Sequence, residues 1–192
     1  MDALTHAIEA RVSSRANVFA DTLANQAIKS ITQNILIAYH HPDNLEAREN
    51  MLVSSTIAGM AFTNVSLGIT HSLAHAFGGK FGVPHGTANA IILPYIIAFN
   101  AQKEHAARIY QEIEELLGCE SLIEEVNRLN RALAIPNSLK SLINDDTEFE
   151  YLLPELAELA KADGCTKTNP RIPTIEQFKH LFKQAYYGNR DD

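Results

Sequence analysis

Three histidines lie within the stretch from Gly68 to Asn89, and their spacing suits a metal ion. His71 and His75 are four residues apart, so on a helix they share one face about one turn apart. His85 follows ten residues later, after a Gly-Gly and a Val-Pro where the chain can turn back. Neutral imidazole is the commonest protein ligand of Zn²⁺ and also suits Fe²⁺. This stretch therefore predicts part of a divalent metal site.

The N-terminal segment offers a second pair of ligand types. Asp2 and His6 are again four residues apart, and such a pair can complete a cage with histidines from another region. Both segments are apolar, and an unpaired imidazole or carboxylate buried there would be costly. Glu9 lies three residues after His6. It can contact the side of a ligand residue that faces away from the metal, or it can face solvent. We expect it to face solvent.

Ordinary structural explanations exist for Asp2 and His75, and for two further residues, Phe62 and Cys165. Asp2 suits a helix N-cap or first turn, where a carboxylate favours the helix dipole. His75 suits a hydrogen-bonded core position, Phe62 a core position, and Cys165 an inert loop position. Spacing alone does not separate metal ligands from other roles among the histidines at 71, 75 and 85.

The elements that position these residues read as helices throughout. Helical periodicity predicts helices over residues 2–12, 18–39, 45–65, 69–78, 85–98, 104–117, 121–133, about 147–162 and 175–187. Gly78 and Gly79 are expected to end the fourth of these, and 163–173 is expected to be a loop. Residues 88–99 are hydrophobic nearly all round, which predicts a central helix. Since no alternating β-branched run stands out, we predict an all-α helical bundle.

Composition narrows the class of protein. With 192 residues, 46% of them hydrophobic, the chain can bury one sizeable core. A net charge of −7 argues against a nucleic-acid partner. The sequence shows no basic amphipathic helix, membrane-length apolar run or signal peptide, so no membrane partner is expected. Two cysteines make no disulfide framework, and a reducing cytoplasm is expected.

Three blocks of the sequence, in this order, resemble the group III iron-containing alcohol dehydrogenase family. They are DALTHAIEA from residue 2, GMAFTNVSLGITHSLAHAFGGKFGVPHGTANAIILPYI from residue 59 and DGCTKTNPRIPT from residue 163. The resemblance runs over nearly the whole chain, and the middle block carries its most specific motif. It implies the helical C-terminal domain of the dehydroquinate synthase-like, iron-containing alcohol dehydrogenase fold.

The resemblance also implies roles for particular residues. One aspartate and three histidines hold a divalent metal in that family, and the matching positions here are Asp2, His6, His71 and His85. His75 matches a histidine that lies near the nicotinamide and takes part in a proton relay. Phe62 and Cys165 match positions at the substrate pocket.

For the complete enzyme the resemblance implies interconversion of a small primary alcohol and its aldehyde, dependent on NAD or NADP. The metal is expected to be Fe²⁺, with Zn²⁺ as competitor because Zn²⁺ lies above Fe²⁺ in the affinity series. It would act as a Lewis acid on the substrate oxygen. No glycine-rich phosphate loop follows a strand in this sequence. The resemblance implies that the dinucleotide is bound mainly by a separate N-terminal α/β domain, which this sequence is expected to lack.

Residues 1–192 are accordingly expected to form a single helical metal-binding domain that assembles as a homo-oligomer. Two alternatives stay open beside the alcohol dehydrogenase. One is a catalytically inactive metal-binding helical fragment, and the other is a zinc-dependent polyol dehydrogenase relative. A purely structural bundle with incidental histidines is a third possibility, and loss of His71 would then leave metal content unchanged.

Overall fold

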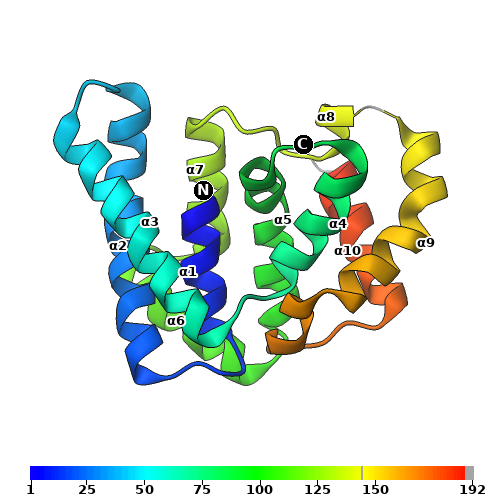
Figure 1. Ribbon diagram of the computed structural model, residues 1–192, viewed down its shortest axis with the longest axis horizontal. Coiled ribbons are helices and arrows are strands. Elements are labelled where there is room, and N and C mark those ends of the chain that lie inside the picture. The colour runs from blue at the N-terminus through cyan, green and yellow to red at the C-terminus, as the bar shows by residue number, and fades with distance from the viewer. Residues whose placement is uncertain (144, 189–192) are drawn as a thin grey trace.

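The computed structural model describes residues 1–143 and 145–188, and every regular element within these ranges is a helix (Figure 1). This confirms the predicted all-α class. The elements are α1 (Asp2–Val12), α2 (Val18–His40), α3 (Leu45–Val65), α4 (Ile69–Phe81), α5 (His85–Asn100), α6 (Glu104–Leu117), α7 (Leu122–Ala132), α8 (Lys140–Ile143), α9 (Asp146–Ala162), the 3₁₀ helix η1 (Gly164–Thr168) and α10 (Ile175–Tyr187).

Helices α2 and α3 form a hairpin at one end of the molecule, with α1 packed beside it (Figure 1). Asn17 and Asn44 begin the two helices, and their side chains accept hydrogen bonds from the backbone amides of Ala20 and Ala47. Fully buried small residues allow the helices to approach closely; they include Ala20, Ala24, Ala27, Ala58 and Ala61. This hairpin gives α1, which carries Asp2 and His6, a fixed support.

Helix α5 lies at the centre of the fold and joins two hydrophobic clusters. Leu93 and Ile97 pack into the cluster formed with α1, α2, α3, α6 and α7. Ile92 and Ile96 pack into the second cluster, with α4, α9 and α10. The predicted central position of this helix is thereby confirmed. His85, its first residue, is anchored by a helix buried on both sides.

Helix α4 is longer than the sequence pattern indicated. It continues through Gly78 and Gly79 to Phe81, so the helix end predicted at these glycines is wrong. The chain turns instead at Gly82, where φ is +68°. This left-handed conformation favours glycine and ends helices. The turn that returns His85 toward α4 is therefore made by residues 82–84.

The segment after α9 is more ordered than the predicted loop. Residues 164–168 form η1, and the carboxylate of Asp163 caps it by accepting a hydrogen bond from the amide of Cys165 at 2.7 Å. Helix α9 itself continues through Pro154 without ending there. The cap fixes the position of the Cys165 backbone at the start of η1.

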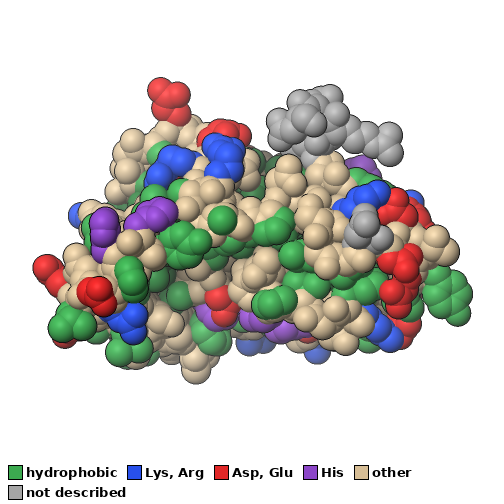
Figure 2. Space-filling view, turned by 90° about the horizontal axis from the view of Figure 1, so that it is seen from above, with side chains coloured by type: hydrophobic (Ala, Val, Ile, Leu, Met, Phe, Trp, Pro, Cys, Tyr) green, Lys and Arg blue, Asp and Glu red, His purple; other side chains and the backbone are tan. Residues whose placement is uncertain are grey.

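The surface carries hydrophobic groups as well as charges. On the face seen in Figure 2, hydrophobic side chains lie between charged side chains of both signs. Leu45 and Leu52 of α3 are 78% and 71% exposed. Among the described residues no single helix is long and apolar enough to cross a membrane. Only the pair α3 and α4, taken together, has the length and apolar composition of a membrane span, and the two helices are bent by 105° where they meet.

Candidate metal centre

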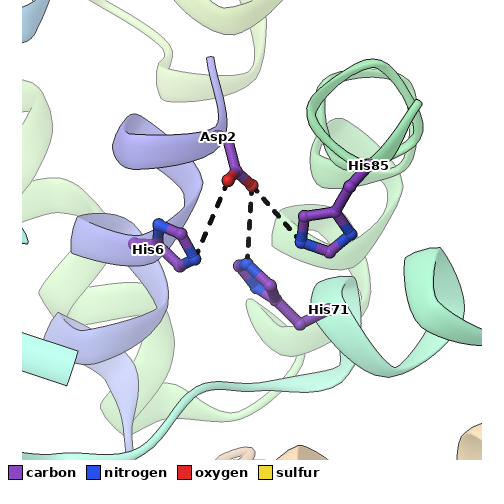
Figure 3. Close-up of side chains that lie close together, drawn as sticks. All are labelled: Asp2, His6, His71 and His85. Carbon is purple, nitrogen blue, oxygen red and sulfur yellow. Dashed lines mark ion pairs between the residues drawn. The ribbon is translucent and has the colours of Figure 1, made fainter. Parts of the chain in front are cut away.

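Four side chains from three helices converge on one point (Figure 3). The Asp2 carboxylate lies between the rings: its oxygens are 4.0 Å from His6 Nε2, 3.7 Å from His71 Nε2 and 3.5 Å from His85 Nε2. Potential ligand atoms of all four residues lie within 4.8 Å of one another. The structure thus brings together the four positions that the resemblance implied as ligands.

The buried ring of His71 shows that the cluster fits a metal ion. His71 is 1% exposed, and its Nε2 atom has no hydrogen-bond partner. A buried, unpartnered imidazole nitrogen is costly unless something binds it. Three imidazoles and one carboxylate suit Zn²⁺ or Fe²⁺, which bind such ligands at about 2.0–2.2 Å.

The charges of the cluster influence one another strongly. Burial and the positive charge of His71 lower the pKa of His6 to about 4, so this ring is neutral at neutral pH. Burial opposes ionisation of Asp2, but contacts with His71 and His6 outweigh it, and the pKa of Asp2 is well below its usual range. A neutral imidazole and an ionised carboxylate are the protonation states that metal ligation requires.

Glu9 overturns one expectation from the sequence, because it faces the protein interior and not solvent. It is 3% exposed. One carboxylate oxygen lies 2.6 Å from His71 Nδ1 and accepts from the Gly68 amide at 2.9 Å; the other accepts from the Thr70 amide at 2.7 Å. Glu9 therefore holds the His71 ring at Nδ1, the nitrogen on the far side from the cluster, and leaves Nε2 directed at the cluster.

Asn89 is a further polar residue that the sequence reasoning did not single out. It lies one turn after His85 and is fully buried. Its amide nitrogen is 2.7 Å from Asp2 Oδ1 and 3.0 Å from His85 Nε2. It thus holds the Asp2 carboxylate in place from α5. The available signal was a polar residue four positions from a histidine on an otherwise apolar helix.

Gly68 leaves the space that this arrangement needs. A Cβ atom at this position would lie 2.7 Å from Asn169 Oδ1 and 2.8 Å from Glu9 Oε1. We expect Gly68→Ala to displace Glu9 and lower the free energy of unfolding by roughly 1–3 kcal/mol, as overpacking does. Urea unfolding measures this. Gly79→Ala is the matched control: nothing lies within 4 Å of its added Cβ, so equal losses in both variants would contradict the prediction.

Metal affinity should depend on pH through His71. Burial alone would lower the pKa of His71, but the Glu9 and Asp2 carboxylates raise it from 6.5 to about 9. Below pH 9 the metal-free ring therefore carries an extra proton, which an ion must displace. We expect Zn²⁺ affinity, measured by chelator competition, to rise up to tenfold per pH unit between about pH 7 and 9. A flat profile over this range would count against ligation by His71.

His75 lies beside the four-residue cluster and not within it. Its ring stacks on that of His85 with centroids 5.1 Å apart, and its side chain is 44% exposed. Its Nδ1 atom is 2.9 Å from Asp163 Oδ2. His75, Asp163 and Cys165 form a separate group of potential ligand atoms. His71 and His75, which lie four positions apart on α4, therefore have different surroundings.

Phe62 and Cys165 flank the same region. The Phe62 ring stacks on His6 with centroids 4.5 Å apart and an interplanar angle of 26°. Cys165 is half-buried, and burial, reinforced by the negative charge of Asp163, raises the pKa of its thiol to about 12. The thiol is therefore uncharged at neutral pH, which suits a wall residue better than a nucleophile.

Fold and site together define an all-helical domain built around a cluster of one aspartate and three histidines. The profile described as "Fe-containing alcohol dehydrogenase family, C-terminal" matches residues 1–186. The chain belongs to the iron-containing alcohol dehydrogenase family and corresponds to the C-terminal domain of its members.

Individual relatives agree with this assignment. The chain is 43% identical to an NADPH-dependent butanol dehydrogenase of Clostridium saccharobutylicum, over 100% of this chain and 51% of that protein. It is 39% identical to a 1,3-propanediol dehydrogenase of Klebsiella pneumoniae, over 97% and 49%. The solved iron-containing alcohol dehydrogenase of Thermococcus thioreducens superposes with a TM-score of 0.91 at 36% identity, covering 98% of this chain and 49% of that one. The chain spans about half the length of the curated relatives it matches.

Proposed function

We propose that this chain is the metal-binding half of an NAD(P)-dependent alcohol dehydrogenase that interconverts a small primary alcohol and its aldehyde. The observation that carries the proposal is the convergence of four ligand-type side chains around His71 Nε2, a buried atom that has no hydrogen-bond partner. The relatives support the substrate class, because their names refer to butanol and 1,3-propanediol.

Asp2, His6, His71 and His85 would hold the ion. Fe²⁺ is supported by the family, and Zn²⁺ competes because the same donors bind it more tightly. When bound, the ion supplies a Lewis acid for the substrate oxygen. Glu9 and Asn89 keep the ligands in place, the first behind His71 and the second beside Asp2.

The remaining residues of the site would handle the substrate and its proton. Phe62 and Cys165 offer an uncharged wall near the cluster. His75 is the residue we assign to the proton relay, because it touches His85 and also reaches solvent. With Nδ1 held by Asp163, its Nε2 atom is available to accept and release a proton.

The dinucleotide, NAD or NADP, would be bound mainly by an α/β domain outside this chain. In support, no strand occurs among residues 1–143 and 145–188, and the relatives are about twice as long. Unpaired Cys119 and Cys165 support a reducing cytoplasmic location. The exposed hydrophobic side chains of α3 support a homo-oligomer.

Two measurements test the proposal. Metal analysis of the purified protein should give one Fe²⁺ or Zn²⁺ per chain. The full-length enzyme should reduce NAD(P)⁺ with 1-butanol or 1,3-propanediol, lose this activity to a chelator and regain it with the ion. The 192-residue chain alone should bind the ion without turnover. A metal-loaded full-length enzyme that acts on glycerol but on neither alcohol would instead favour the polyol dehydrogenase alternative.

A further inference from the structure

The two histidines on α4 each have a carboxylate beside Nδ1. Glu9 contacts Nδ1 of His71, and Asp163 contacts Nδ1 of His75 at 2.9 Å. Glu9 is buried, whereas Asp163 and His75 lie where solvent reaches. A carboxylate beside histidine Nδ1 thus occurs both at His71, a candidate metal ligand, and at His75, which lies beside the four-residue cluster.

Asp163 contacts three neighbouring residues through its carboxylate. Its Oδ1 atom accepts a hydrogen bond from the Cys165 amide at 2.7 Å and lies 3.4 Å from Ser72 Oγ. Its Oδ2 atom is left for His75. Burial opposes ionisation, but the hydrogen bonds from Cys165 and His75 outweigh it and lower the pKa of Asp163. An ionised carboxylate only accepts hydrogen bonds, so the His75 nitrogen facing it must carry a proton.

We propose that Asp163 is a positioning residue: its carboxylate holds His75 in the tautomer with a proton on Nδ1 and an unprotonated Nε2, while the same carboxylate caps η1 and places Cys165. His75 then presents a proton-accepting nitrogen in a fixed orientation. The use of that nitrogen in a relay rests on the proposed function. The His75 tautomer and the cap of η1 do not depend on the proposed function.

The replacement Asp163→Asn separates these contributions, because an amide has one oxygen where the carboxylate has two. Capping Cys165 needs an acceptor, so the amide oxygen takes the place of Oδ1. The NH₂ group then faces His75 Nδ1, and only an unprotonated Nδ1 can accept from it. The proton must therefore move to Nε2. In the reverse orientation the new NH₂ group would face the backbone N–H of Cys165. Two donors would then lie opposite each other with no acceptor between them, which is unfavourable.

Nuclear magnetic resonance reads this change directly. In long-range ¹H–¹⁵N spectra of the Zn²⁺-loaded chain, recorded at mildly alkaline pH, wild-type His75 should show the Nδ1–H tautomer. Asp163→Asn should show Nε2–H. Ser72→Ala is the matched control. It removes the 3.4 Å contact to Asp163 Oδ1 and the Ser72 contacts with Thr166 Oγ1 and the Gly68 carbonyl, but it leaves Asp163 Oδ2 facing His75. The tautomer should therefore be unchanged. An Nδ1–H tautomer in folded Asp163→Asn overturns the proposal.

A second variant keeps the test decisive if Asp163→Asn fails to fold. Asp163→Ser retains a capping oxygen for the Cys165 amide but has no second oxygen for His75. We expect circular dichroism and zinc stoichiometry like the wild type, with a His75 ring that is no longer a single tautomer. A fixed Nδ1–H tautomer in Asp163→Ser would likewise overturn the proposal.

The full-length enzyme supplies the kinetic readout. Asp163→Asn should lower kcat for the alcohol by about 10²–10⁴-fold, the range expected when a proton-transfer histidine has the wrong tautomer. The KM should change little, because the metal ligands are untouched. Unchanged kcat with an inverted tautomer would refute the positioning role. If even the wild type oxidises no alcohol, the proposed function fails, and the spectra still decide the proposal about Asp163.

Discussion

Replacing His71 with alanine should abolish tight metal binding. A four-ligand site binds Zn²⁺ with roughly 10–16 kcal/mol, so one ligand accounts for about 3 kcal/mol, or about 10²-fold in affinity. His71 should lose at least this much. It is the most buried of the four ligand positions, and water cannot easily take its place. Chelator-competition titration with Zn²⁺ and metal analysis of the purified variant measure the loss.

His75→Ala is the matched control, because it removes the other histidine of the same helix. His75 lies outside the four-residue cluster, so this variant should keep its metal affinity within a few-fold. Full metal content in His71→Ala would show that the histidines are incidental. Equal losses in both variants would show that the α4 surface, and not the cluster, binds the ion.

Removing the Glu9 carboxylate should have the largest effect on stability. Glu9→Ala leaves the Gly68 amide, the Thr70 amide and His71 Nδ1 without their acceptor. Unpaired buried donors cost about 1–3 kcal/mol each, and breaking a buried ion pair costs about 3–5 kcal/mol. We expect the free energy of unfolding to fall by about 3–5 kcal/mol and the Tm by roughly 10 °C, as measured by urea and thermal unfolding.

Glu9→Gln isolates the effect on the metal. The amide keeps an acceptor oxygen but loses the charge that supports His71, so metal affinity should fall about 10–100-fold, as for other groups that orient a ligand. Glu112→Gln is the control, since Glu112 is a half-exposed carboxylate paired with Arg11. Wild-type metal affinity in Glu9→Gln would show that the Glu9 contact is structural only.

Helix positions and ligand candidates were largely predictable, because both depend on short-range patterns. The periodicity of apolar residues gave α2, α3 and α5 to within a few residues, and α10 spans the predicted residues 175–187. The Asp2 and His6 pair needs only helical spacing to share a face. Resemblance to a family, and not spacing, selected His85 and excluded His75 as a ligand.

The residues that orient the ligands were not predictable by the same means. Glu9 receives its hydrogen bonds from residues 59–62 positions away, and Asp163 meets His75 across 88 positions. Helical spacing carries no information about such contacts. The end of α4 was also misplaced, because Gly78 and Gly79 resemble a terminator locally. The position that needs a positive φ is Gly82.

The placement of the ligands between the two hydrophobic clusters has a consequence for the domain as a whole. Helix α1 belongs to one cluster, α4 to the other, and α5 to both. An ion held by Asp2, His6, His71 and His85 would cross-link helices whose apolar contacts are otherwise largely separate. Occupancy would then make the two halves unfold as one unit, and an empty site would allow one half to open before the other.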